Sequence, residues 1–341
     1  MSVPRQSRRD FPRYVQYADS RLADAVRESS RLTPRDHHVL ALLSRHRAMR
    51  ADHLARLAFP NIHRARHRLL LLTDRGVLAR ARRRDTWNGR RPWIYTLGPV
   101  GQMIHAVRAD ARMPKPAETI ERVFRVLQSP TLEHDLGVID VLARLVDHSR
   151  HHPGAQLDHW QTAAAVAEEC GGIVRPDAGA TWTEQTEQGP PPARVVFFLE
   201  YDADTEPHRV LLRKIDAYAE LADTGLTRPV LFVFSGPARE QHFHDHLTHR
   251  YRGAPPVPIA TTDHGRTWAN PDPDRDATAH PHRHRGAYAA PYGPWGPDGA
   301  PDTFPAVGDG SGPHGVLSPA QSVWWRPGDP ARRALAQVTG P

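Results

Sequence analysis

The chain has 341 residues, and its 45 lysines and arginines outnumber its 38 acidic residues, which gives a formal net charge of +7. This length is enough for two domains, and a hydrophobic content of 39% is enough for real cores. The single cysteine, Cys170, excludes an intramolecular disulfide, and no apolar run reaches the length of a membrane span. The first residues also lack the apolar region of a signal peptide, so we expect a cytoplasmic protein.

The region nearest the amino terminus has the pattern of three helices followed by a hairpin. Thr33 is typical of the capping residue of a first helix, residues 51–58 favour a second helix, and Asn61 can cap a third. An Asn-Gly turn then joins two apolar runs between residues 76 and 97. This order predicts a winged helix-turn-helix domain over residues 30–105.

The same region is strongly basic, because it contains fourteen arginines and three acidic residues between Arg45 and Arg91. Such a field favours nucleic acid as the partner, so we expect double-stranded DNA to bind here. A third helix with Arg64, Arg68 and Arg75 on its outer face, followed by a basic wing, would supply phosphate contacts. The alternative is a winged helix that contacts protein, or a basic face that is only solvated. The arginines expected at the DNA are Arg64, Arg66, Arg68, Arg75, Arg82, Arg83, Arg84, Arg90 and Arg91.

Residues 106–128 are interpreted as a linker with a connecting helix, and residues 129–268 as a second domain. The first element of this domain is a helix whose apolar positions recur at helical spacing. Glu133 lies in its first turn, where it is either a metal ligand or an ordinary acidic residue favoured by the helix dipole. Apolar runs at residues 228–234 and 257–262 predict further strands of the domain's sheet.

Three carboxylates and a lysine stand at the ends of predicted elements in the second domain. A nearly continuous apolar strand ends in Glu200 and Asp202, whose side chains emerge on one face because they are two residues apart. Asp177 follows a proline where a neighbouring strand is expected to begin, so two antiparallel strands can bring it near Glu200. A helix over residues 207–223 comes next, and Lys214 points with its apolar stripe toward the sheet.

Lysine is rare in this chain, since only Lys115 and Lys214 are lysines among the 45 basic residues. Arginine presents a wide planar fork, whereas lysine is a compact charge that suits contact with a scissile phosphate or an attacking water. The group is therefore interpreted as a nuclease-type metal site for Mg²⁺. The alternative is an internal lysine–glutamate ion pair without chemistry. The expected catalytic residues are Asp177, Glu200, Lys214, Asp202 and Glu133, and the expected metal ligands are Asp177, Glu200 and Glu133.

The order of Pro176-Asp177, a strand ending in Glu200-Tyr-Asp202 and a helix with Lys214 resembles a PD-(D/E)xK nuclease core whose lysine has moved to the helix. More closely, the run from Leu32 to about Asp263 resembles the actinobacterial replication-relaxation family, which joins a winged helix to such a core. The resemblance implies an α/β (α+β) protein in which a restriction-endonuclease-like mixed sheet follows the winged helix. Asp202 departs from the pattern, because it occupies the strand position of the standard lysine.

The resemblance implies a DNA-binding protein of plasmids or mobile elements that nicks or cuts DNA with Mg²⁺. A second hypothesis keeps the DNA binding and omits the chemistry: the protein is then a transcription or replication regulator whose degenerate nuclease fold mediates dimerisation or docking. The expected protein partners are a second copy of the chain and replication or transfer proteins, and no membrane partner is expected.

The last part of the chain differs in composition. Proline, glycine, aspartate and histidine dominate residues 269–314, which are interpreted as a disordered insertion, and residues 315–341 are expected to dock back onto the second domain. A histidine-rich run, His242-Phe-His244-Asp245-His246, resembles a metallo-hydrolase motif that lacks one residue. We interpret it as the exposed face of a helix over residues 238–251.

Overall fold

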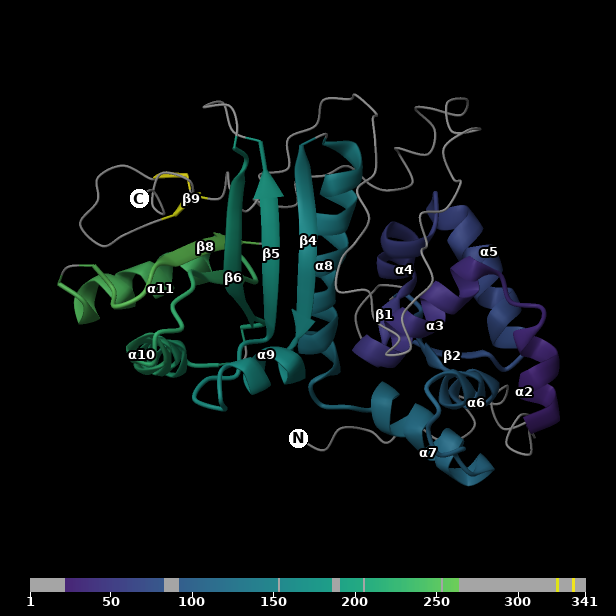
Figure 1. The fold of residues 1–341 in the computed structure, drawn as a ribbon. Helices are drawn as coiled ribbons and strands as arrows, with labels where there is room; N and C mark the ends of the chain where they lie inside the picture. Colours follow the sequence, from purple (N-terminus) through teal and green to yellow (C-terminus); the bar gives the residue numbers. More distant parts are fainter. Residues whose placement is uncertain are drawn as a thin grey trace. The chain divides into compact units, whose positions relative to one another are not determined.

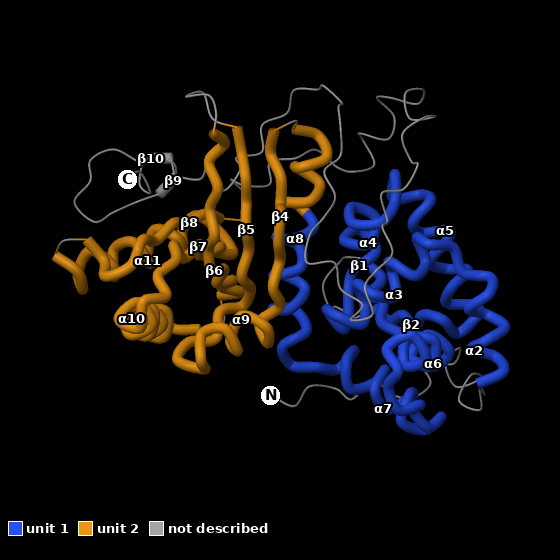
Figure 2. Tube along the Cα trace, in the orientation of Figure 1, with its two compact units in different colours: residues 1–143, 273–301 blue, residues 144–272, 302–341 orange. Residues whose placement is uncertain are grey.

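The computed structural model describes residues 22–82, 92–152, 154–185, 191–204, 206–252 and 254–263, and the backbone of residues 323–324 and 333–334. These residues form a mixed structure of helices and two sheets, which confirms the predicted α/β (α+β) class (Figure 1). They fall into two compact units, of which the first ends at Ala143 among the described residues and the second begins at Arg144 (Figure 2). Across the described residues, no helix is long and apolar enough to cross a membrane.

The first unit contains the expected amino-terminal elements in the expected order. Its elements are α2 (Leu22–Ser29), α3 (Pro34–His46), β1 (Met49–Arg50), α4 (Ala51–Ala58), α5 (Ile62–Asp74), β2 (Leu78–Ala81), β3 (Ile94–Leu97), α6 (Pro99–Arg108) and α7 (Pro116–Leu127). Thr33 and Asp36 form a capping box that starts α3, because each side chain accepts a hydrogen bond from the other residue's amide. The Asn61 side chain accepts from the Arg64 amide and caps α5.

The strands of the first unit form an antiparallel sheet in the order β1-β3-β2. β2 and β3 pair with Leu78 opposite Leu97, as expected for the two arms of the predicted hairpin. The predicted Asn-Gly turn lies outside the described residues, as do Arg83, Arg84, Arg90 and Arg91. α7 matches the predicted connecting helix, whereas α6 was not predicted as a separate helix.

The second unit has a seven-stranded sheet. Its elements are the end of α8 (Leu132–His151), which begins in the first unit, and β4 (Ala155–Thr162), α9 (Ala163–Glu169), β5 (Ala178–Glu184), β6 (Ala193–Asp202), α10 (His208–Asp223), β7 (Val230–Phe234), α11 (Pro237–Arg250), β8 (Ile259–Asp263), β9 (Val323–Trp324) and β10 (Arg333–Ala334). The strand order is β10-β9-β8-β7-β6-β5-β4. β4, β5 and β6 are antiparallel neighbours, β6, β7 and β8 are parallel, and β9 is antiparallel to β8. The sheet is therefore mixed, as predicted.

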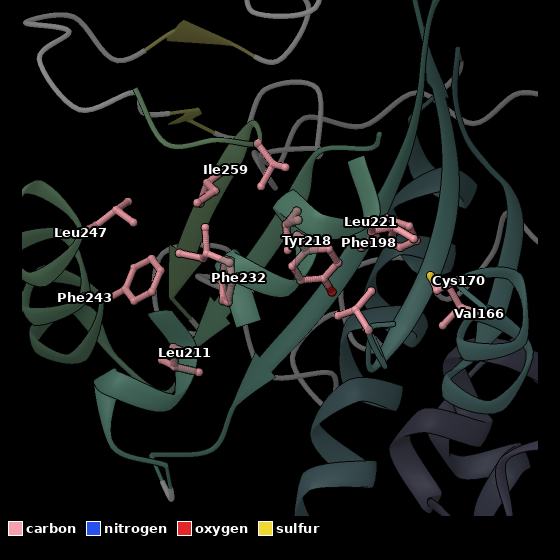
Figure 3. Close-up of a cluster of buried hydrophobic side chains, with 14 of the residues drawn as sticks. Val166, Cys170, Phe198, Leu211, Tyr218, Leu221, Phe232, Phe243, Leu247 and Ile259 are labelled. Atoms are coloured by element: carbon pink, nitrogen blue, oxygen red, sulfur yellow. The ribbon is translucent and has the colours of Figure 1, made fainter. Parts of the chain in front are cut away.

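Alternation along β6 divides its side chains between the two faces of the sheet. Phe198 belongs to the main core cluster with Tyr218 of α10, Phe232 of β7 and Phe243 of α11 (Figure 3). Glu200 lies two residues after Phe198 and so faces the same helices. The apolar core beneath α10 and α11 thereby fixes where the carboxylates at the end of β6 emerge.

The end of α8 packs against the opposite face of the sheet. The Leu157 amide of β4 donates to the Ser149 hydroxyl at 3.1 Å, and the His148 ring lies 5.8 Å from the Trp182 ring of β5, centroid to centroid. β5 begins directly after Asp177, where the sequence predicts a strand to start. β4 was not predicted from the sequence.

Candidate functional site

Glu200 is the buried centre of the candidate site. It lies near the end of β6 and is 1% exposed. The Lys214 ammonium donates to Glu200 Oε2 at 2.8 Å, and the Tyr218 hydroxyl donates to Oε1 at 2.6 Å. Both donors come from α10 and are four residues apart, so they project from one face of that helix. The interpretation that Lys214 points toward the sheet agrees with this contact.

Asp177 is held beside Glu200 by the pairing of β5 with β6. Ala178 lies opposite Leu199, and the Asp177 amide donates to the Leu199 carbonyl at 3.0 Å. The Tyr201 amide donates to Asp177 Oδ2 at 2.8 Å, which fixes the carboxylate at the end of β6. Asp177 is half-buried and its charge acts on both Glu200 and Lys214. The structure thus brings together three of the predicted residues.

The electrostatics of this group follow from burial and from the unequal number of charges. Burial, and after it the nearby Asp177 charge, raise the pKa of Glu200 to about 7 against the opposing effects of Lys214 and Tyr218. Burial alone would lower the pKa of Lys214, but Glu200, Asp177 and Glu206 outweigh burial and raise it. Glu206 Oε2 lies 3.4 Å from the ammonium. Three carboxylates around one lysine leave an excess of negative charge, which suits a hard divalent cation.

Asp202 is bound to a different partner. Arg239 of α11 donates from Nε to Asp202 Oδ2 at 2.7 Å, and the Asp204 amide donates to Oδ1 at 3.0 Å. Arg239 Nε also lies 3.2 Å from Asp204 Oδ1. Asp202 therefore belongs to an ion pair with α11 and is not bonded to Lys214.

Glu133 lies in the first turn of α8 and is exposed. It belongs to the first unit, whereas Asp177, Glu200, Asp202 and Lys214 belong to the second. Its assignment as a metal ligand stays a prediction.

The predicted DNA-binding arginines differ in their exposure and in their ion pairs with acidic residues. Arg64, Arg66 and Arg82 are exposed. The predicted outward position of Arg68 is wrong, because its guanidinium donates to the fully buried Asp36 carboxylate at 2.8 and 2.5 Å. Arg75 is half-buried, with Nη1 3.8 Å from Glu28 Oε2.

Basic and aromatic side chains lie close together where β2 ends and β3 begins. The guanidinium carbons of Arg80 and Arg82 lie 4.1 and 4.2 Å from the centre of the Trp93 ring, which is the geometry of cation–π contacts. Burial raises the pKa of Tyr95, and the charges of Arg80, Arg82 and Arg66 oppose this shift. Arg66 of α5 is thus near enough to this strand pair to act on it electrostatically.

A group able to hold a metal ion is present in the first unit, although the sequence did not indicate it. Single ligand atoms of Asp52, His53 and Asp140 all lie within 4.8 Å of one another. Arg50 donates to Asp52 at 3.2 and 3.3 Å and to Asp140 at 2.8 Å, and Arg56 Nη1 lies 3.6 Å from Asp140. Burial and Arg50 lower the pKa of His53, so its ring is neutral near pH 7. Two arginines already balance two carboxylates, which favours an ion-pair network over a cation site.

The histidine-rich helix is α11, and only part of its histidine run is exposed. His242 and His246 are exposed, whereas His244 is buried with Nε2 2.7 Å from the Thr261 hydroxyl. The prediction that the whole run is exposed is therefore wrong for His244.

Comparison with known proteins gives one positive finding. No curated protein and no solved structure matched the chain. The model of the replication-relaxation family matches residues 40–234, which is more than half of the 341 residues and includes Asp177, Glu200 and Lys214. The chain therefore belongs to the replication-relaxation family.

Proposed function

We propose that this replication-relaxation protein binds double-stranded DNA through its first unit and nicks or cuts DNA with Mg²⁺ at Asp177, Glu200 and Lys214. Membership of the family indicates a function related to replication. The proposal of DNA binding is supported by the exposed Arg64, Arg66 and Arg82, because guanidinium groups on a helix and on a strand pair can contact successive phosphates.

One observation supports the cleavage site above all. The buried Glu200 of β6 and the half-buried Asp177, directly before β5, both act on Lys214 of the following helix α10. The oxygens of Asp177 and Glu200 would hold Mg²⁺, which would supply an activated water and stabilise charge on the phosphate. Lys214 would neutralise the phosphate or orient the water. Tyr218 fixes the Glu200 carboxylate through its hydroxyl.

The raised pKa of Glu200 fits this role. Without a cation, burial and the Asp177 charge favour the protonated acid. A divalent cation between the two carboxylates would favour their ionised forms, so we expect cation binding to release a proton near neutral pH. Glu206 adds a third negative charge near Lys214.

A second candidate function is a DNA-binding regulator without cleavage activity. It is favoured by a specific observation: both Glu200 oxygens already accept hydrogen bonds, and Asp202 is bound to Arg239. A closed ion-pair network of this kind needs no cation. The second unit would then serve as a surface for dimerisation or for docking replication or transfer proteins.

Incubation with supercoiled plasmid and Mg²⁺ or Mn²⁺ separates the two functions. We expect wild-type protein to produce nicked or linear DNA, and Lys214→Ala and Asp177→Ala to reduce the rate by roughly 100-fold or more. Lys115→Ala, which changes the chain's other lysine in the first unit, is the matched control and should keep the wild-type rate. Intact DNA binding with no conversion by wild-type protein would instead support the regulator.

A further inference from the structure

A cavity of about 310 Å³ lies in the first unit, and none of its lining residues belongs to the carboxylate–lysine group. Its size falls at the lower end of the range for small-molecule sites. Apolar side chains come from α3, β3 and α7, and the polar ones include three arginines and a glutamine. The lining includes the apolar Leu43, Leu97 and Val126 and the polar Arg47, Arg122 and Gln102.

Gln102 lines this cavity and links β3 to α7 through its side-chain amide. Its Nε2 donates to the Leu97 carbonyl at 3.2 Å and to the Thr119 carbonyl at 2.9 Å, which fixes the orientation of the amide. Its Oε1 is buried and has no hydrogen-bond partner among the described residues. The side-chain amide therefore fixes the positions of β3 and α7, two of the elements that line the cavity.

Two of the arginines that line the cavity have no carboxylate partner among the described residues. Within the part that the structure describes, Arg47 and Arg122 make no ion pair with a carboxylate, whereas Arg125 beside them is paired with Glu121 at 2.5 Å. Arg122 is exposed on α7. None of the described residues that line the cavity is a carboxylate, so its arginines favour an anionic group such as phosphate or carboxylate.

The backbone at Arg47 is held in a strained turn. Its φ is 67° and its ψ is −48°, and the Ala48 amide donates to the His46 carbonyl at 2.8 Å, which together define a γ-turn. The Thr96 hydroxyl donates to the Arg47 carbonyl at 2.6 Å and stabilises it. A glycine would adopt this conformation with less strain, yet the chain has an arginine at this position, which lines the cavity.

We propose that this cavity binds a small organic anion. Its phosphate or carboxylate would lie between Arg47 and Arg122, and its apolar or aromatic body would pack on Leu43, Leu97 and Val126. A nucleoside monophosphate and an aromatic hydroxy acid both have these two features. The proposal does not depend on DNA cleavage.

Isothermal titration of the full chain tests the two features together. AMP is the phosphate probe, salicylate is the carboxylate probe, and adenosine and inorganic phosphate each lack one required feature. We expect AMP or salicylate to bind with a Kd of about 100 µM or lower. Adenosine and inorganic phosphate should each bind at least roughly tenfold more weakly. Failure of both organic anions to bind would overturn the proposal.

Variants test whether binding occurs at this cavity. Arg47→Gly removes the guanidinium and accepts the positive φ, so we expect at least a roughly tenfold loss of affinity with an unchanged or higher Tm. Arg122→Ala should lose affinity similarly, and Arg112→Ala is a control because Arg112 is exposed, pairs with Glu118 and does not line the cavity. Wild-type affinity in Arg47→Gly would overturn the proposal. Displacement of the bound anion by duplex DNA would also overturn it, because the arginines would then belong to the DNA surface.

Discussion

Glu200 shows how one residue's surroundings set its chemistry. Burial and the nearby Asp177 charge raise the pKa of Glu200 to about 7, and hydrogen bonds from Lys214 and Tyr218 limit the rise. A carboxyl group with such a pKa exchanges its proton near neutral pH, which is the range in which acid–base chemistry is useful. The same environment means that ionisation of Glu200 lowers the free energy of unfolding.

We predict a pH dependence of stability from this group. Because the folded pKa lies above the unfolded value of about 4.5, the folded state binds more protons between about pH 4.5 and pH 7. The free energy of unfolding should fall by up to about 3 kcal/mol as the pH rises through this window. Glu200→Gln should remove that slope in urea unfolding measured at several pH values. Glu206→Gln, at the more exposed partner of Lys214, should keep it, and an unchanged slope in Glu200→Gln would contradict the assignment.

At the scale of elements, Asp36 joins α3 to α5. Its carboxylate completes the capping box with Thr33 and also accepts two hydrogen bonds from Arg68. Burial alone would raise the pKa of Asp36, but Arg68 and Thr33 outweigh burial and lower it. Asp36 therefore contributes stability above a pH of about 3.8, and this contribution is lost as the pH falls through its folded pKa.

We predict that Asp36→Ala destabilises the first unit by about 3 kcal/mol, because it removes a helix cap and leaves Arg68 without its buried partner. Urea unfolding at neutral pH measures the change. Glu121→Ala breaks the exposed pair with Arg125 and should cost less than about 0.5 kcal/mol. Equal effects of the two substitutions would contradict the structural role of Asp36.

Elements with strong local signals were predictable from the sequence. Thr33 and Asn61 mark the starts of α3 and α5, and the apolar run of β6 marks a central strand. β4 was missed because its exposed and buried positions do not alternate cleanly, and its register shifts between Leu157 and His159. The hydrophobic pattern of the sequence was therefore enough to predict β6, which is buried on both faces, but not the irregular strand β4.

Side-chain partners far apart in the chain were predictable only in part. Lys214 was placed toward Glu200 because its position on an apolar helical stripe faces the sheet. The same reasoning could not show that Asp202 binds Arg239, or that Arg68 binds Asp36, because periodicity gives the face of an element and not its partner. The grouping of His53 with Asp140 depends on tertiary structure for the same reason.

At the scale of the whole molecule, the first compact unit would bind DNA and the second would cleave it. The arginines of the first unit would supply most of the affinity through phosphate contacts, which release counterions. The second unit would supply chemistry that does not depend on those contacts. Changes in each unit should therefore alter different measurements.

We predict that Arg64→Ala combined with Arg82→Ala weakens duplex binding and reduces the slope of log K against log salt by about 2. Fluorescence anisotropy at several NaCl concentrations measures this change. Arg213→Ala, at an exposed arginine of α10 in the second unit, should keep the wild-type slope. A similar loss of slope in Arg213→Ala would show that the DNA surface is not confined to the first unit.

The helix α8 has a consequence for how this protein can evolve. Leu132 and Leu136 belong to a core cluster of the first unit, whereas Ser149 binds β4 and His148 lies beside Trp182 in the second. A crossover between two genes anywhere within α8 would join a front half selected in one background to a back half selected in another. A crossover between Leu136 and His148 would keep each of these contacts within the unit that it came from, so exchange between related genes is expected to be tolerated in the middle of α8.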